Sequence, residues 1–266
     1  MTASAMPLTR REHRQRRQRQ RSRATFASVF GELLLTAGVL VMLFVAWQMW
    51  IGDIIISAQN NSAGQAVSDE WANQQPPEPP PVVDDGEGST WYEPPVLEHP
   101  ESGATFAQMH VPRFGSDYNV QVAGGTSRPV TLDNGWIGVY DQSVMPGQVG
   151  NFSVAGHRTT WGFPLNRIDK LKLDDAIVIE TQEGWYTYRF RTLQYVTPDS
   201  VDVLLDVPQV PEVATGERYM TLTACSPLYS LAERIVGYSV FEGFQPRSEG
   251  PPASLDPVAE VASPSW

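Results

Sequence analysis

Cysteine is nearly absent from this sequence, because Cys225 is the only one in 266 residues. A chain with a single thiol has no intramolecular disulfide, so its fold is not a disulfide scaffold. The lone cysteine is either a small buried hydrophobic residue or a reactive group, and composition leaves both open. One cysteine and four scattered histidines offer no metal-ligand spacing, so we expect neither a metal nor any other cofactor.

Two common catalytic patterns are also missing. The sequence contains no GxSxG and no GxxxxGK[ST], which argues against serine hydrolases of that type and against P-loop nucleotide binding. A papain-type thiol hydrolase would carry its cysteine at the start of a helix, with the histidine later in the chain. Here Cys225 follows a strand-like segment and the histidines precede it.

Basic residues are scarce outside the N-terminus, since eight of the 19 precede position 24. A basic run can bind nucleic acid, but this one leads directly into residues 29–51, which hold a single ionisable group, Glu32. A helix of that length rises about 35 Å, enough to cross a hydrocarbon core of about 30 Å. We therefore expect a membrane anchor with a cytoplasmic N-terminus, and no nucleic-acid partner. A cleaved signal peptide would have a shorter apolar region and a small-x-small site.

Changes in composition divide the chain into five parts. Residues 1–28 form the basic cytoplasmic tail and 29–51 the single-pass anchor. Residues 52–103 are rich in proline and acidic side chains and predict an extracellular coil-like stalk. Residues 104–244 are enough for one core and form the extracellular domain, and 245–266 predict a disordered tail.

The extracellular domain shows the short, period-two patterns of β-strands. In residues 185–193, Tyr186, Tyr188 and Phe190 alternate with polar residues, as in a half-buried strand. About eight such segments, separated by turn signals, predict an all-β barrel or sandwich with only short helices. The helical stretches fall near 164–171 and 199–206.

Three side chains of this domain could act together on a substrate. Cys225 ends one strand-like segment, and His157 begins the polar loop that follows a second strand-like segment. Both side chains would therefore project from the rigid end of a strand. Arg234 starts the next strand and could lie beside Cys225, where its charge would stabilise an oxyanion. A histidine is the usual base for a reactive thiol. His99 falls in the stalk, and His110 is interpreted as an ordinary strand side chain.

At these residues the sequence resembles the sortases, bacterial cell-surface cysteine transpeptidases built on an eight-stranded β-barrel. The likeness covers roughly 111–244 and is carried by TLTACSP, by the arginine nine residues after its cysteine, and by GNFSVAGHRTTWG. It implies that Cys225 attacks the Thr-Gly carbonyl of a sorting signal and forms a thioacyl intermediate. It also implies that His157 shuttles protons and that Arg234 stabilises the tetrahedral oxyanion.

The block MPGQVGNFSVAGHRTTWG resembles class E sortases, which prefer LAxTG over LPxTG signals. That likeness implies substrate-binding roles for Tyr140 and Thr223. It implies as partners surface proteins that bear a sorting signal and a peptidoglycan precursor that supplies the acceptor amine. One departure stands out, because Ala224 occupies the position before the cysteine where sortases commonly have threonine.

A second function from another class has the same anchor, stalk and barrel. In that alternative the domain is catalytically silent and binds surface peptides or wall components. The two functions differ in whether Cys225 reacts with an acyl group.

Overall fold

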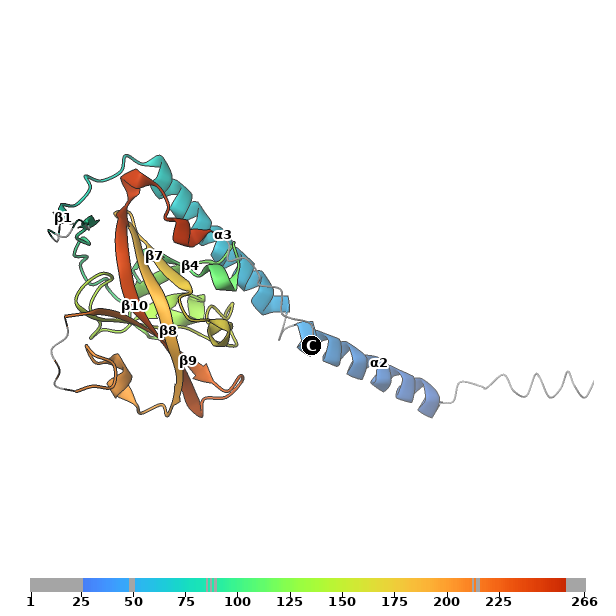
Figure 1. The fold of residues 1–266 in the computed structure, drawn as a ribbon. Helices are drawn as coiled ribbons and strands as arrows, with labels where there is room; N and C mark the ends of the chain where they lie inside the picture. The colour runs from blue at the N-terminus through green and yellow to red at the C-terminus, as the bar shows by residue number, and fades with distance from the viewer. Residues whose placement is uncertain are drawn as a thin grey trace, which may run out of the picture. The chain divides into compact units, whose positions relative to one another are not determined.

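A computed structural model gives the fold of the chain (Figure 1). The chain divides into two compact units, with the boundary after Ile51. The described residues are 26–47, 51–84, 86, 88, 90–211, 213 and 216–256. The predicted cytoplasmic tail therefore lies almost entirely outside the described residues.

The N-terminal unit holds one long apolar helix, α2 (Phe26–Ala46). None of its residues is buried, and by length and composition it could cross a membrane. Its 21 residues would rise about 32 Å, close to the thickness of a hydrocarbon core. The helix overlaps the predicted anchor at 29–51 but begins three residues earlier, and 48–50 lie outside the described residues.

The second unit is built on a closed eight-stranded barrel with the strand order β10-β8-β7-β3-β4-β5-β6-β9. This confirms the predicted all-β barrel. Two of the neighbouring pairs, β4 with β5 and β6 with β9, are parallel, and the others are antiparallel. The strands are β3 (Thr105–His110), β4 (Asn119–Gly124), β5 (Ile137–Val139), β6 (Gly150–Ala155), β7 (Ala176–Glu180), β8 (Gly184–Val196), β9 (Arg218–Ser226) and β10 (Glu233–Pro246).

The barrel interior is a single apolar core. Tyr186, Tyr188 and Phe190 are buried in it, as their alternation along β8 predicted. Phe152 from β6 stacks near Tyr188, with ring centroids 6.5 Å apart. Within the described residues, the helices in the connections between barrel strands are short 3₁₀ turns. They include η4 (Ile168–Lys170) and η5 (Val201–Leu204), where short helical stretches were expected.

The prediction of a coil-like stalk is wrong for its first part, because Gly52–Asn73 forms a 22-residue helix, α3. Figure 1 shows α3 lying along one side of the barrel, where it packs against β4. Gly64 permits this approach, since an added methyl group would lie 2.4 Å from the carbonyl oxygen of Asn119. Small residues and polar contacts hold α3 on the barrel, rather than an apolar face. The hydrophobic pattern of its sequence therefore did not predict a helix.

The proline-rich segment after α3 also lies on the barrel rather than extending as a free stalk. It includes the two-stranded sheet of β1 (Val82–Asp84) and β2 (Thr90–Tyr92). Further along, Glu93 pairs with Arg218 at 2.7 Å. The carbonyl oxygen of Pro95 accepts a hydrogen bond from the Tyr186 hydroxyl at 3.1 Å.

The predicted disordered tail at 245–266 is also corrected in part. Strand β10 continues to Pro246 and is followed by η6 (Arg247–Glu249) and η7 (Ala253–Leu255), while 257–266 lie outside the described residues. Arg247 is buried and stacks on the Trp185 ring at 4.6 Å. Packing of this side chain fixes the C-terminal segment on the barrel.

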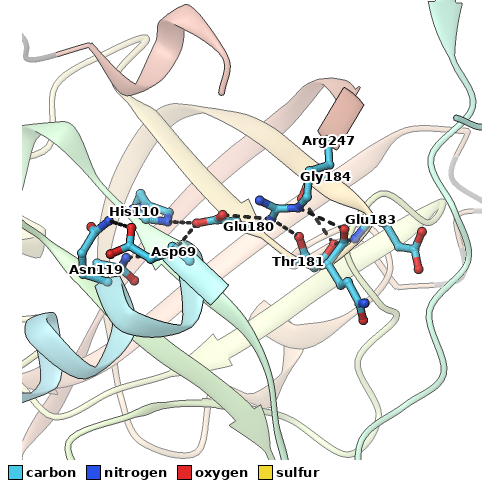
Figure 2. A network of polar contacts seen from close by, with 11 residues as sticks. Asp69, His110, Asn119, Glu180, Thr181, Glu183, Gly184 and Arg247 are labelled. Carbon is cyan, nitrogen blue, oxygen red and sulfur yellow. Dashed lines mark hydrogen bonds and ion pairs between the residues drawn. The ribbon is translucent and has the colours of Figure 1, made fainter. Parts of the chain in front are cut away.

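A buried polar network joins these added segments to β7 (Figure 2). Glu180 of β7 accepts hydrogen bonds from Ser68 of α3 at 2.6 Å and from Arg247 at 2.9 Å. His110 Nε2 lies 2.7 Å from the same carboxylate. His110 is therefore a structural side chain, in keeping with its interpretation from the sequence.

Candidate active site

Two adjacent parallel strands bring His157 and Cys225 to the same end of the barrel. Strands β6 and β9 pair in a register that aligns Ala155 with Thr223. The backbone N–H of Gly156 then donates to the carbonyl oxygen of Thr223 at 3.1 Å. Because His157 and Cys225 each follow this aligned pair by two residues, they lie at the same level, His157 just after β6 and Cys225 near the end of β9.

Arg234 reaches the same rim from the other side of β9. In the antiparallel pairing of β9 with β10, Arg234 lies directly opposite Cys225. Its Nη1 donates to the carbonyl oxygens of Leu231 and Glu233, at 3.2 and 3.0 Å. Among the residues that the structure describes, no carboxylate forms an ion pair with Arg234. Its charge is thus available to an anionic group in the site.

A cavity of about 580 Å³ lies at this rim. It is lined by all five of the predicted site residues, Cys225, His157, Arg234, Tyr140 and Thr223. Cys225 is a free thiol with partial exposure. The structure thus brings together side chains that are far apart in the sequence, while His99 and His110 are not among the described residues that line the cavity.

The imidazole of His157 has a carboxylate partner that the sequence did not reveal. His157 Nε2 lies 2.8 Å from Oδ1 of Asp133, and 13% of the histidine side chain is exposed. Asp133 belongs to the short helix η3 (Leu132–Asn134), in the connection from β4 to β5. In the sequence this stretch, LDNG, indicates only a turn, and nothing in it points to a histidine 24 positions later.

Tyr140 and Thr223 form a hydrogen-bonded pair on another wall of the cavity. Thr223 donates its hydroxyl to the carbonyl oxygen of Val154 at 3.2 Å. The Tyr140 hydroxyl lies 2.9 Å from Thr223 Oγ1 and is then the donor of that bond. Tyr140 itself is held by its backbone N–H, which donates to the carbonyl oxygen of Ser153 at 3.1 Å.

Arg158 is one of three arginines that line the cavity, with Arg128 and Arg234, and sequence reasoning missed it. It is buried, and its Nη1 donates to Oγ of Ser226 at 3.4 Å, next to Cys225 in the chain. Its Nη2 lies 3.6 Å from Asp169. Burial raises the pKa of Asp169, but Lys170 and Arg158 outweigh it and hold that pKa below its usual range. A positive charge at this wall favours anionic groups in the cavity.

The arrangement has the parts that acyl transfer through a thiol requires. A partly exposed thiol, an imidazole and an arginine that pairs with no carboxylate of the described residues share one rim. Thiolate attack needs a base and a donor for the developing oxyanion. Among the described residues, no group of three or more His, Cys, Asp or Glu side chains gathers as a metal site would require.

Comparison with known proteins identifies the family. The sortase domain matches residues 109–241 of this chain. Sortase SrtE1 of Streptomyces coelicolor is 35% identical over 261 residues, which make up 95% of this chain and 68% of that protein. Sortase SrtE2 of the same organism is 32% identical over 229 residues, 84% of this chain and 85% of that protein. The chain therefore belongs to the sortase family, a family of transpeptidases.

Solved sortase structures share the barrel. The SrtA sortase from Actinomyces oris superposes with a TM-score of 0.58 at 32% identity, covering 65% of this chain and 96% of that one. Sortase E1 from Streptomyces coelicolor, solved with a tripeptide in its active site, gives a TM-score of 0.54 at 36% identity. That match covers 59% of this chain and 99% of the other. The resemblance inferred from the sequence motifs is thereby confirmed, and sortases E are among the relatives.

Proposed function

We propose that this chain is a membrane-anchored cysteine transpeptidase of the class E type. It cleaves an LAxTG or LPxTG sorting signal between Thr and Gly and transfers the protein to an amine of the cell wall. The observation that carries the proposal is the convergence of Cys225, His157 and Arg234 on one cavity at the ends of adjacent strands. The similarity to sortases SrtE1 and SrtE2 supports the class.

In the acylation step, the Cys225 thiolate adds to the threonine carbonyl carbon of the signal. The resulting oxyanion is stabilised by Arg234, whose guanidinium stays charged and donates along fixed directions. Collapse of the tetrahedral adduct breaks the Thr-Gly C–N bond, and His157 protonates the departing glycine amine. The threonine carbonyl remains bound to sulfur as a thioester.

In the transfer step, an amine of the wall precursor attacks the thioester carbonyl. His157 accepts a proton from that amine, the new amide bond forms, and the Cys225 thiolate leaves. The histidine and the thiolate return to their starting states, so no cofactor is consumed. The substrates are a surface protein with a sorting signal and a peptidoglycan precursor.

The experiment that tests this function uses the full chain in detergent, an LAxTG or LPxTG peptide and a glycine-type amine. Mass spectrometry should find the peptide, cleaved after threonine, bound to Cys225, and the ligated product should follow. Cys225→Ala should abolish both species. If the wild type neither acylates nor ligates, or if Cys225→Ala ligates as well, the chain is not this enzyme and a silent peptide-binding barrel becomes the better account.

His157 and Arg234 are tested by His157→Gln and Arg234→Lys in the same assay. Loss of the proton carrier should reduce turnover by about 10²–10⁴-fold. Loss of the forked donor should reduce it by about 10²–10³-fold. Near-wild-type turnover in a folded variant would remove that residue from the mechanism.

The proposed location is the cell membrane, spanned by α2, which overlaps the predicted anchor at 29–51, with the barrel outside the cell. It is supported by the length and composition of α2 and by the arginine-rich residues before it. Protease added to intact cells should remove the barrel and leave a short membrane-bound fragment. Complete protection of the barrel in intact cells would contradict this orientation.

A further inference from the structure

We propose that Asp133 is a positioning residue for His157, which holds the imidazole in one tautomer and one orientation. The inference rests on the proposed function of His157 as proton carrier. Among the described residues, Asp133 is the only hydrogen-bond partner of the imidazole ring, through Nε2 at 2.8 Å. Asp133 does not line the cavity, so it acts through the histidine rather than on the substrate.

The contact selects the tautomer because a carboxylate only accepts hydrogen bonds. A neutral imidazole carries its proton on one ring nitrogen and presents a lone pair on the other. With Asp133 accepting at Nε2, the proton of the neutral ring stays on Nε2 and Nδ1 is the basic atom. Nδ1 is then the atom that takes and returns the proton of each acyl-transfer step. The side chains are 13% and 23% exposed, and this shielding from water strengthens their contact.

The carboxylate of Asp133 also contacts Arg128, and that contact is weaker than the one with His157. Nε of Arg128 lies 3.4 Å from the same Oδ1, and the Arg128 side chain is 66% exposed. An exposed ion pair of this kind adds little, because water screens it and a long side chain must be ordered to make it. Arg128 therefore leaves the carboxylate free to hold the imidazole.

The backbone that carries Asp133 is fixed from two sides. From α3, Asn60 Nδ2 donates to the carbonyl oxygens of Asn134 and Gly135, at 3.2 and 3.4 Å. Gly135 has a φ of +76°, and a methyl group added there would lie 2.4 Å from the carbonyl oxygen of Trp161. Trp161 follows His157 by four residues. The turn bearing Asp133 thus packs directly against the loop bearing His157.

Helix α3 also contacts the loop that bears His157. The backbone N–H of Gly162 donates to Oδ1 of Asp53, near the start of α3, at 3.3 Å. A methyl group at Gly162 would lie 3.0 Å from Cγ2 of Ile56. Helix α3 therefore contacts both the turn of Asp133 and the loop of His157. These contacts hold the carboxylate and the imidazole within hydrogen-bonding distance of each other.

The first test is spectroscopic and needs no activity. The full chain holds only four histidines, so ¹⁵N-histidine labelling in detergent gives few imidazole signals, and His157→Gln assigns the one at the site. The neutral ring of the wild type should be in the Nε2–H form. In Asp133→Asn, the amide can donate a hydrogen bond to Nε2, so the population of the Nδ1–H form should rise. A wild-type ring in the Nδ1–H form would overturn the proposal.

The second test separates positioning from general structure. Asp133→Asn should lower kcat by about 10²-fold or more, as expected when a catalytic histidine adopts the wrong tautomer. KM for the sorting peptide should change less than about twofold, because Asp133 does not line the cavity and its exposed pair with Arg128, which does line it, is weak. Asp133→Glu, which restores a carboxylate, should recover part of kcat.

A matched control is Asp174→Asn, because Asp174 pairs with Arg191 on the exposed surface and is outside the cavity. It should leave kcat and the His157 tautomer unchanged. Acylation of Cys225 in the wild type, with full kcat and an unchanged tautomer in Asp133→Asn, would reject the positioning role while leaving the proposed function intact. Failure of wild-type acylation would reject that function instead, and the tautomer measurement would still decide the geometry.

Discussion

Glu180 joins α3, β3, β7 and the C-terminal segment, so its removal should be far more costly than removal of an ordinary carboxylate. Its side chain is buried and accepts hydrogen bonds from Ser68 and Arg247, with His110 at 2.7 Å (Figure 2). Glu180→Ala would leave the buried Arg247 guanidinium without its carboxylate. Breaking a buried ion pair from one side costs about 3–5 kcal/mol.

For a domain of this size, that loss lowers the thermal midpoint by about 6–20 °C. The assay is thermal unfolding of the full chain in detergent, followed by tryptophan fluorescence. The matched control is Glu242→Ala, since Glu242 pairs with Arg189 at 2.8 Å while its side chain is 47% exposed. An exposed pair contributes at most about 1 kcal/mol. A loss in Glu180→Ala no larger than that in Glu242→Ala would refute the structural role of Glu180.

The loss of stability caused by Glu180→Ala should also depend on pH. Burial by itself raises the pKa of Glu180, but hydrogen bonds from His110, Ser68 and Arg247 outweigh it and place the pKa below its usual value. A carboxyl whose pKa is lower in the folded state stabilises the fold above its unfolded pKa of about 4.3. That contribution is lost as the pH falls through the lower, folded value. The difference in midpoint between wild type and Glu180→Ala should therefore be full at pH 7 and shrink below about pH 4.

Three further predictions concern single side chains. Tyr188→Phe removes the buried hydroxyl that accepts from the Gly147 N–H at 2.8 Å, and thermal unfolding should show a loss of about 1–3 kcal/mol. Gly64→Leu should push α3 off the barrel, because a Cβ there would lie 2.4 Å from the Asn119 carbonyl oxygen. Limited proteolysis should then cut the variant within α3, whereas the wild type should resist cleavage there. Tyr140→Phe removes a hydrogen bond at the cavity wall and should change the LAxTG to LPxTG ratio of kcat/KM by about 2- to 10-fold; an unchanged ratio would exclude Tyr140 from selectivity.

The barrel could be predicted from the sequence because its signal is local. Tyr186, Tyr188 and Phe190 alternate along one strand, and that alternation predicted that these three side chains share the core face. It did not predict that Thr187, on the other face, is buried too. Cys225 and His157 could be placed at a rim for a similar reason, since each stands where a strand-like pattern ends. Their convergence depended on a parallel pairing of β6 with β9, which no local pattern encodes.

Helix α3 could not be predicted because its stability comes from distant partners. Ser68 bonds to Glu180, 112 positions later in the chain, and it also accepts a hydrogen bond from Asn119. These polar contacts replace the apolar stripe by which an amphipathic helix is usually recognised. Arg247 near the C-terminus was missed for the same reason, since its partners Trp71 and Trp185 lie on other elements.

Asp133 shows how a contact at the candidate site can be hidden in a turn signal. The residues LDNG favour a turn wherever they occur, so the aspartate was explained by turn chemistry alone. Its contact with His157 forms only because the β4–β5 connection packs against the loop after β6. Sequence reasoning found the histidine, whose residue type is rare in the chain, and missed the carboxylate, whose type is common.

The contacts of α3 show that the domain that carries the candidate site begins before residue 104. A domain starting at residue 104 would lose Asn60, which holds the carbonyl oxygens next to Asp133, and Asp53, which holds the N–H of Gly162. It would also expose Glu180 where Ser68 now covers it. The barrel strands would remain, but the two loops that set the His157 geometry would lose one of their supports. A unit that keeps these contacts therefore starts with α3, at Gly52, so the chain that follows the candidate membrane span also supports the loop of His157.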